Sequence, residues 1–354
     1  MGNDEENSEE TLMVKEVACK QHVKYFQRFL KFSPAYTSFQ DCSRLYLAFL
    51  AISGLDILNA LDTISEDGKA HIIEWVYSLQ IVPNEAYSVD RCGFQGSHSH
   101  IIKGYPHEYE KGHIVMTYTA LAILIILGDD LSKVNKEAVL AGIKALQLEN
   151  GSFCAAKHEE SDMRFVYCAA CISYFLNDFK ALDIDKLKKF IKSSINYDGG
   201  VGQGPDLESH GGSTFCAIAA LHLCGILNEI FDDQQAAKLI RWCINRQVTG
   251  FQGRPNKLVD TCYSFWLGGT LHLLNVFDKI DFKSNRDYIL STQDNLLGGF
   301  AKGPDIHTDP LHTYLGLCGL SLMKEDSLLQ LNPALNITQR AHKFLKGLHE
   351  NWKS

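Results

Sequence analysis

Two kinds of hydrophobic segment alternate along the chain. In the first kind, apolar residues recur three and four positions apart among polar ones, which predicts amphipathic helices. These segments span residues 72–80, 139–147, 187–195, 239–247 and 286–293. In the second kind nearly every position is apolar, which predicts helices that are buried on almost all faces. These segments span residues 117–128, 164–176, 214–225, 262–274 and 313–323. The chain is therefore expected to be all-α and built from helix pairs.

A glycine-containing turn separates the two members of each pair, and the turns recur at a regular interval. Their aromatic or apolar residues are spaced 59, 48, 50 and 49 residues apart, at Phe94, Phe153, Val201, Phe251 and Phe300. With an earlier pair at residues 25–32 and 43–58, this period predicts about six helix pairs. Amphipathic outer helices alternating with apolar inner ones favour a closed α/α toroid, although an open solenoid fits the repeat too.

The composition is typical of a large folded domain with a short polar extension. The chain has 354 residues, of which 45% are hydrophobic and only 8 are proline, so it can bury a sizeable core. We expect a single toroid domain over residues 15–354, with repeats of about 48–50 residues. Residues 1–14 are acidic at their start and are expected to form a flexible tail.

Charge and cysteine content limit the possible partners and location. A net charge of -8 without a basic block argues against nucleic acid as a partner. The longest apolar run is much shorter than the roughly 20 residues that a membrane span needs, so no span is expected. Six of the 11 cysteines lie in apolar, helix-like segments, where reduced thiols pack as small hydrophobes. These features predict a soluble, cytoplasmic protein, and the pair Cys168 and Cys171 is expected to pack in the core.

Aromatic residues mark one place near the start of each apolar segment. These landmarks are spaced 49, 48, 48 and 51 residues apart, at Tyr118, Tyr167, Phe215, Tyr263 and Tyr314. In a toroid all inner helices begin at one end of a central cavity, so the residues just before the landmarks should face one another. Most of the residues five positions before the landmarks are polar, namely His113, Asp162, His210 and Asp309, with Leu258 as the exception.

Three residues at this end have the chemistry of metal ligands. Asp260 and Cys262 precede Tyr263 by three and one residues, and His312 precedes Tyr314 by two, so adjacent helices can bring them together. One oxygen, one sulfur and one nitrogen ligand suit Zn²⁺ and leave its fourth position open, as in catalytic zinc sites. An ordinary structural role, with Asp260 as a helix cap, Cys262 in the core and His312 at the rim, is the alternative for these residues taken alone. Their placement in adjacent repeats favours the metal.

A second polar group at the same end is rich in hydrogen-bond donors. Its members are His210, Arg254, Lys257, Tyr263 and Arg164. In an acidic protein such donors beside a metal predict a site for a phosphorylated group, with an ordinary solvated loop as the alternative. The apolar cavity below, with Trp266 on its wall, would suit a long hydrocarbon.

Seven stretches carry a resemblance to a known family. They are ALQLENGSFCA, DMRFVYCAAC, LESHGGSTFC, GRPNKLVDTCYSFW, YILSTQD, GGFAKGPD and DPLHTYLGLCGLSLM. In these stretches the sequence resembles the β subunits of protein prenyltransferases, most closely those of the type I geranylgeranyl enzymes, over nearly the whole chain. The resemblance implies an α/α toroid of the prenyltransferase and terpenoid cyclase type. It also implies an obligate heterodimer with the α subunit that farnesyl and geranylgeranyl CaaX transferases share.

The resemblance also implies roles for individual residues. The zinc ligands correspond to Asp260, Cys262 and His312. Side chains that bind the diphosphate correspond to His210, Arg254, Lys257 and Tyr263. Positions in the isoprenoid cavity correspond to Arg164, Tyr167 and Trp266. The implied reaction moves a geranylgeranyl group from geranylgeranyl diphosphate to the cysteine of a C-terminal CaaX motif, after zinc has converted the cysteine thiol to a thiolate.

Two residues in the resemblance favour the type I enzyme over farnesyltransferase. Lys302 stands where farnesyltransferase β subunits have a magnesium-binding aspartate, so magnesium is not expected to be required. Leu311 stands where those subunits have tyrosine. The last residue of the acceptor should then be Leu or Phe, bound near His113, Val115 and Phe165, and Rho-type small GTPases are expected substrates.

Tyr46 departs from the type I pattern, because geranylgeranyl enzymes have a small residue there and farnesyl enzymes have Trp. A bulky ring at the cavity floor could shorten the cavity, so a farnesyl-transferring β subunit stays an alternative. A Rab-type β subunit shares the zinc and diphosphate groups, whereas a terpene cyclase would need an aspartate-rich motif that the chain lacks. A noncatalytic helical-repeat scaffold is the alternative from another class.

Overall fold

The computed structural model describes residues 16–31, 41–84, 88–99 and 110–353. The tail expected at residues 1–14 lies outside this part of the chain. Six pairs of helices form the body, each with an outer helix followed by an inner one. The outer helices are α1 (Cys19–Lys31), α3 (Glu66–Ser78), α5 (Lys136–Leu146), α7 (Ile184–Ser193), α10 (Asp233–Ile244) and α12 (Phe282–Ser291). The inner helices are α2 (Arg44–Ile57), α4 (Ile114–Leu127), α6 (Met163–Phe175), α8 (Gly211–Leu223), α11 (Tyr263–Leu273) and α13 (Pro310–Leu322).

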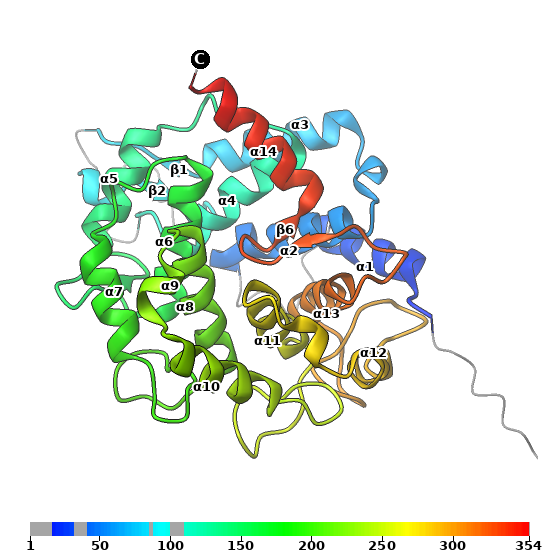
Figure 1. Cartoon of the computed structure of the whole chain (residues 1–354). Coiled ribbons are helices and arrows are strands. Elements are labelled where there is room, and N and C mark those ends of the chain that lie inside the picture. The colour runs from blue at the N-terminus through cyan, green and yellow to red at the C-terminus, as the bar shows by residue number, and fades with distance from the viewer. Residues whose placement is uncertain (1–15, 32–40, 85–87, 100–109, 354) are drawn as a thin grey trace, which may run out of the picture.

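The inner helices form a closed ring, which decides between the two predicted architectures. Each inner helix packs against the next one along the chain, and α13 packs against α2. Figure 1 shows this ring with α5, α7, α10 and α12 around its outside. The α/α toroid of six helix pairs predicted from the period is therefore confirmed, and the open solenoid is wrong.

Strands and further short helices connect or close the ring. Three two-residue antiparallel pairs occur, β1 (Gln80–Ile81) with β2 (Gly93–Phe94), β3 (Phe153–Cys154) with β4 (Ser161–Asp162), and β5 (Leu331–Asn332) with β6 (Ile337–Thr338). The short helix α9 spans Leu227–Ile230, and 3-10 turns span Leu61–Thr63, Val89–Arg91 and Phe277–Lys279. The last helix, α14 (Gln339–Asn351), lies across one end of the ring (Figure 1).

Backbone hydrogen bonds tie five of the six inner helices to the turn of the next repeat. The donor is the residue at the start of the inner helix, and the acceptor is a turn carbonyl. The five bonds run from Leu45 to Gly96 (3.0 Å), Ile114 to Ala155 (2.8 Å), Met163 to Gln203 (2.9 Å), Gly211 to Gly253 (2.8 Å) and Thr261 to Lys302 (3.0 Å). We call the acceptors the turn positions. The equivalent donor in the sixth repeat is Pro310, which has no N–H.

The residue before each of these donors is called the rim position. Rim positions are Arg44, His113, Asp162, His210, Asp260 and Asp309. Counting five residues onward gives an aromatic side chain in every repeat, namely Phe49, Tyr118, Tyr167, Phe215, Phe265 and Tyr314. Ring centroids of successive members lie 5.5, 5.9, 5.3 and 4.9 Å apart from Phe49 to Phe265, and Phe49 lies 5.8 Å from Tyr314. A belt of aromatic rings therefore runs around the inside of the toroid.

This register corrects the landmark expected in the fifth repeat. The equivalent aromatic residue is Phe265, two residues after the expected Tyr263, so the residue five positions before it is Asp260 and not Leu258. The first turn of α11 explains the error. Tyr263, Ser264 and Phe265 donate to carbonyls three residues back, as in a 3-10 helix, so the regular α-helix begins later than in the neighbouring repeats.

The end of the ring away from the rim positions is closed by the segment 334–336, between β5 and β6. The hydroxyls of Tyr118 and Tyr314 donate to the carbonyls of Leu335 (3.0 Å) and Asn336 (2.8 Å). The segment is buried, and α14 continues from it. The repeat pattern in the sequence did not predict that the segment 334–336 closes the ring, because this segment lies outside the six repeats.

Helix α1 joins the first repeat to the last through a buried histidine. The Nδ1 atom of His22 accepts from the backbone N–H of Gly299 (2.9 Å), and its Nε2 atom donates to Gln293 (2.9 Å). Burial, opposed by the weaker effect of the bond to Gln293, lowers the pKa of His22 from 6.5 to about 4. The folded state therefore holds this imidazole neutral.

We predict that acidification from pH 6.5 to 4 destabilises the fold through His22. The unfolded chain binds the proton in this range and the folded chain does not, so the free energy of unfolding falls with pH by up to about 3 kcal/mol. Urea unfolding across this range should show the extra loss in the wild type and not in His22→Gln. The exposed residue His71 provides the control, and a His71→Gln variant should keep the wild-type dependence. Equal pH slopes in wild type and His22→Gln would contradict the prediction.

Candidate active site

The rim positions place polar side chains at the start of the inner helices. His113, Asp162, His210 and Asp309 are the N-cap residues of α4, α6, α8 and α13, and each side chain accepts a backbone N–H of its own helix. Asp260 does the same for the N–H of Cys262 (3.0 Å). Because these helices start at one end of the ring, their partial positive N-terminal charges converge there with the polar side chains.

Asp260, Cys262 and His312 form the cluster that the sequence predicted. One ligand atom from each lies within 4.8 Å of the other two. Asp260 and Cys262 are buried, with 8% and 7% exposure, and His312 is half-buried. Asp260 occupies a rim position, Cys262 follows it by two residues, and His312 follows the next rim position by three. The carboxylate, thiol and imidazole can together hold a metal ion.

The charges around His312 show why this cluster attracts a cation. Burial disfavours the imidazolium, but hydrogen bonds to Asp260 (3.2 Å from Nε2) and Asp309 (2.6 Å from Nδ1) outweigh it and raise the pKa of His312 to about 9. Burial and the Asp260 carboxylate raise the pKa of the Cys262 thiol well above its ordinary value. Without a metal, a proton on His312 therefore supplies the positive charge between two carboxylates.

Asp309 is a site residue to which sequence analysis gave no role. Its Oδ1 accepts the backbone N–H of His312 (2.9 Å), and its Oδ2 accepts from Nδ1 of the same residue. This contact fixes the ring of His312 and leaves Nε2 facing Asp260. The sequence signal was an aspartate three residues before the histidine, the spacing of a helix cap.

His210 and Tyr263 form a second pair beside the cluster. The Nδ1 atom of His210 accepts the N–H groups of Gly212 (3.1 Å) and Ser213 (3.4 Å), so a neutral ring carries its proton on Nε2. Burial, with the Arg254 charge, lowers the pKa of His210 and favours this neutral form. Nε2 then donates to the Tyr263 hydroxyl (2.9 Å), whose own proton is left to donate to a ligand.

The cationic side chains predicted for this rim are present but differ in their contacts. Arg254 forms an ion pair with Glu208. The exposed Lys257 lies in the same turn, with its backbone N–H bonded to the Arg254 carbonyl (3.3 Å). The ammonium of Lys302 lies 3.8 Å from Oδ2 of Asp260, whereas His312 contacts Oδ1 of the same carboxylate. Arg164 is half-exposed and donates twice to Asp162.

The remaining predicted residues lie deeper or on the opposite side of the rim. Tyr167 belongs to the aromatic belt, and Trp266 packs on Phe215 with ring centroids 5.2 Å apart. The rings of His113 and Phe165 meet edge to face at 6.3 Å. The backbone N–H of Val115 donates to His113 (3.2 Å).

Tyr46, which sequence analysis expected at the cavity floor, lies just before the aromatic belt on its helix. It follows its rim position by two residues, as Cys262 and Leu311 do, and so lies in the first turn of α2. The far end of the ring is closed by the segment 334–336. Tyr46 is half-buried, and its ring stacks on Phe49 with centroids 6.5 Å apart.

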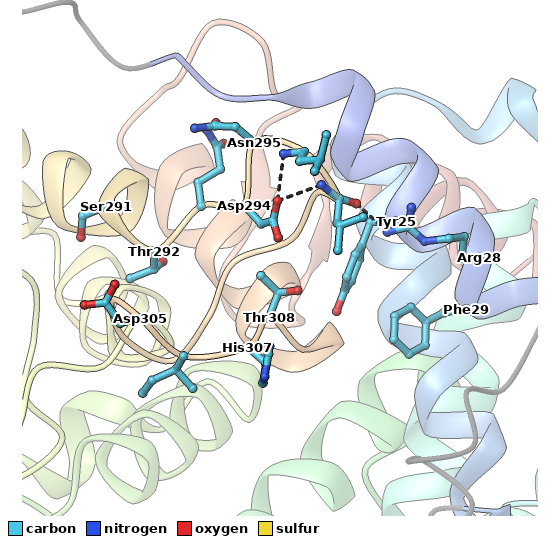
Figure 2. Close-up of a pocket in the computed structure, with 14 residues that line it drawn as sticks. Tyr25, Arg28, Phe29, Ser291, Thr292, Asp294, Asn295, Asp305, His307 and Thr308 are labelled. Atoms are coloured by element: carbon cyan, nitrogen blue, oxygen red, sulfur yellow. Dashed lines mark hydrogen bonds between the residues drawn. The ribbon is translucent and has the colours of Figure 1, made fainter.

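A groove of about 1250 Å³ lies between α1 and the loops of the sixth repeat. Figure 2 shows Tyr25, Arg28 and Phe29 on the α1 side and the segments 291–297 and 305–308 opposite. None of the predicted site residues lines it. Thr308, which lines the groove, directly precedes the rim position Asp309 in the sequence.

Comparisons with known proteins agree with this arrangement. Residues 17–337 match the prenyltransferase alpha-alpha toroid domain. The chain is 40% identical over 337 residues to the geranylgeranyl transferase type-1 subunit beta of Dictyostelium discoideum, covering 90% of this chain and 94% of that protein. It belongs to the family of type-1 geranylgeranyl transferase β subunits. The Arabidopsis thaliana member of this family is 37% identical over 332 residues, covering 89% of this chain and 88% of the relative.

A solved structure of the same enzyme type has the same fold. It is titled Candida albicans protein geranylgeranyltransferase-I complexed with GGPP, and it matches with a TM-score of 0.86 and 27% identity. The match covers 94% of this chain and 99% of that one. The resemblance to type I β subunits is thus confirmed, and the scaffold alternative is wrong. Among the described residues, no helix of this type-1 β subunit has the length and apolar character of a membrane span.

We predict that Asp309→Asn weakens metal binding by about 10- to 100-fold, because a metal-binding histidine depends on the group that holds its other ring nitrogen. Asparagine keeps the helix cap but removes the charge that orients His312. A competition titration of Zn²⁺ against a coloured chelator measures the change. Asp305→Asn, in the same loop but exposed, is the control and should bind as the wild type does. Unchanged affinity in Asp309→Asn would refute a positioning role.

Proposed function

We propose that this type-1 β subunit transfers a geranylgeranyl group from geranylgeranyl diphosphate to the cysteine of a C-terminal CaaX motif. The observation that carries the proposal is the cluster of Asp260, Cys262 and His312 on the same rim as the His210–Tyr263 pair. One part has the ligands of a catalytic metal and the other has donors for an anion. The relative solved with GGPP supports the choice of lipid.

Zinc is the metal we assign to the cluster. Asp260, Cys262 and His312 would hold it, because three ligands of O, S and N type are characteristic of catalytic zinc and the site already favours positive charge. When bound, zinc supplies a Lewis acid that lowers the pKa of an incoming thiol. Asp309 keeps His312 oriented throughout.

The diphosphate leaves with the electron pair of the C1–O bond while the acceptor sulfur forms a bond to C1. Negative charge grows on the leaving group, so donors aimed at it stabilise the transition state more than the ground state. Tyr263 has a free hydroxyl proton for this purpose, and His210 holds that hydroxyl in place. Arg254 and Lys257 neutralise the departing charge. Lys302 adds a fixed ammonium, and magnesium is then not required.

The hydrocarbon chain lies against the apolar wall of the toroid in this proposal. Tyr167 and Trp266 present aromatic faces there, and the guanidinium of Arg164 lies over the Phe165 ring near the rim. Tyr46, in the first turn of α2, contacts either the lipid or the acceptor and sets the space between them. The bulk of its ring is the observation that favours farnesyl transfer as a second candidate function.

The acceptor is proposed to be a protein ending in CaaX with Leu or Phe last, such as a Rho-type small GTPase. Its last side chain would enter the pocket near His113, Val115, Phe165 and Leu311, where His113 and Phe165 meet. The α subunit shared by CaaX transferases is the proposed partner, and the cytoplasm the proposed location. All eleven cysteines are free, which agrees with a reducing compartment.

We predict that zinc binding releases about two protons per ion near pH 7. His312, with a pKa of about 9, and Cys262, with a raised pKa, both carry protons there and must lose them to become ligands. The apparent affinity should therefore rise with pH, and less steeply above about 9, where His312 has already lost its proton. Calorimetry in two buffers of different ionisation enthalpy gives the number of protons. Cys262→Ala should release about one, and release of none by the wild type would contradict the assignment.

We predict that the chain, co-expressed with a candidate α subunit, transfers geranylgeranyl in preference to farnesyl without magnesium. The assay offers both diphosphates in competition with a CaaX peptide ending in Leu. Tyr46→Thr should leave this preference or strengthen it, because it enlarges the cavity. If the wild type transfers only farnesyl, and Tyr46→Thr gains geranylgeranyl transfer, the assigned lipid is wrong and Tyr46 sets the length of the cavity. A Lys302→Ala variant that gains activity with added Mg²⁺ would support the role of the ammonium.

A further inference from the structure

Each rim position meets the turn position of the next repeat, and in two repeats the contact is made by a long side chain. The amide of Gln203 donates to the rim residue Asp162 (2.8 Å). The ammonium of Lys302 lies 3.8 Å from the rim residue Asp260. Both turn residues are exposed and reach back over the start of the preceding inner helix. In these two repeats the neighbouring turn therefore supplies a partner to the rim residue.

The repeat between these two has no such contact. Its rim residue is His210, and the turn position opposite is Gly253, which has no side chain to offer. The partner of His210 is instead the hydroxyl of Tyr263 (2.9 Å), which comes from α11. Gly253 is buried, unlike Gln203 and Lys302.

The ring of Tyr263 takes the space that a side chain at the turn position would need. A Cβ atom added to Gly253 would overlap Cζ, the hydroxyl oxygen and Cε2 of Tyr263. A Cβ added to Gly211 would lie 3.0 Å from Cδ1 of the same ring. The N–H of Gly211 donates to the carbonyl of Gly253 (2.8 Å), so the two glycines are joined and form one surface under the ring.

Backbone conformation does not explain the glycine at this position. Gly253 is not among the residues with positive φ, so an alanine there meets no backbone strain. The remaining reason for a glycine at this position is that the ring of Tyr263 needs the space. Because the overlapping atoms are at the free end of the tyrosine side chain, a methyl group at this position would displace the hydroxyl and leave the backbone in place.

We propose that Gly253 is a positioning residue of the reaction, which seats the ring of Tyr263 so that its hydroxyl meets His210 and directs its proton at the diphosphate. This inference rests on the proposed function, because it assumes that Tyr263 stabilises the leaving group. A side chain at Gly253 separates the hydroxyl from His210 without touching the metal ligands.

The test compares Gly253→Ala with Gly204→Ala in the complex with the α subunit. Gly204 lies in the equivalent turn of the preceding repeat, and an added Cβ meets its nearest atom at an ordinary 3.8 Å. Gly253→Ala should lower kcat by about 10- to 100-fold, the usual cost of misplacing one transition-state donor, with little change in the KM of the acceptor peptide. Zinc content and melting temperature should match those of Gly204→Ala, which should keep kcat within about twofold.

Variants of Tyr263 separate this inference from the proposed function. In a Tyr263→Ala background, Gly253→Ala should have no further effect, because no ring remains to be displaced. An equal loss of kcat on adding Gly253→Ala to the wild type and to Tyr263→Ala overturns the inference. Full activity of Gly253→Ala overturns it too, if Tyr263→Phe is slow. Full activity of Tyr263→Phe itself overturns the role of the hydroxyl in the proposed function, whatever Gly253→Ala does. Loss of zinc or of stability in Gly253→Ala would also overturn the inference, since the defect would then be structural.

Discussion

Five hydrogen bonds from the inner helices to neighbouring turns set the height of each helix in the ring. Because every bond uses the same repeat position, the rim residues and the two or three residues after them come to one level. Residues that are about 50 positions apart in sequence, such as Cys262 and His312, therefore become neighbours. No loop has to fold over the site to bring them together. The active site is thus a consequence of the register between repeats.

The same register concentrates opposite charges in a small space. The carboxylates of Asp260 and Asp309 lie on either side of His312 and keep its imidazole protonated in the absence of metal. Cationic side chains and helix N-termini lie on the neighbouring part of the rim. One part of the rim favours a cation and the adjoining part favours an anion. A thiol and a diphosphate ester can be brought together where these two parts meet.

The fold was largely predictable because its period is long, regular and carried by apolar residues. The helix pairs and the approximate level of the site followed from that period alone. The register of the fifth repeat was not predictable, since the first turn of α11 is tightened and the local sequence offers two aromatic residues, Tyr263 and Phe265. Asp309 and Gly253 were missed for another reason. Their roles depend on contacts with His312 and Tyr263, which hydrophobic periodicity does not report.

Tyr46 shows what the resemblance to type I β subunits could not predict. Its identity marked a departure from the type I pattern, but only the structure gave its depth, in the first turn of α2. A residue at that depth can act on the acceptor as well as on the lipid. The size of this side chain can therefore affect the selection of the lipid and of the acceptor together.

Open arrays of repeats need terminal capping units with a polar outer face, whereas a ring can cover its end repeats with each other. In this ring the sixth donor position is Pro310, and a proline cannot make the bond by which every other repeat engages its successor. The last repeat therefore lacks this bond. It packs instead on the first repeat, through side chains of α1 and α2. The ring is thus closed between the sixth and first repeats by side-chain contacts, without the backbone bond that joins the other neighbours.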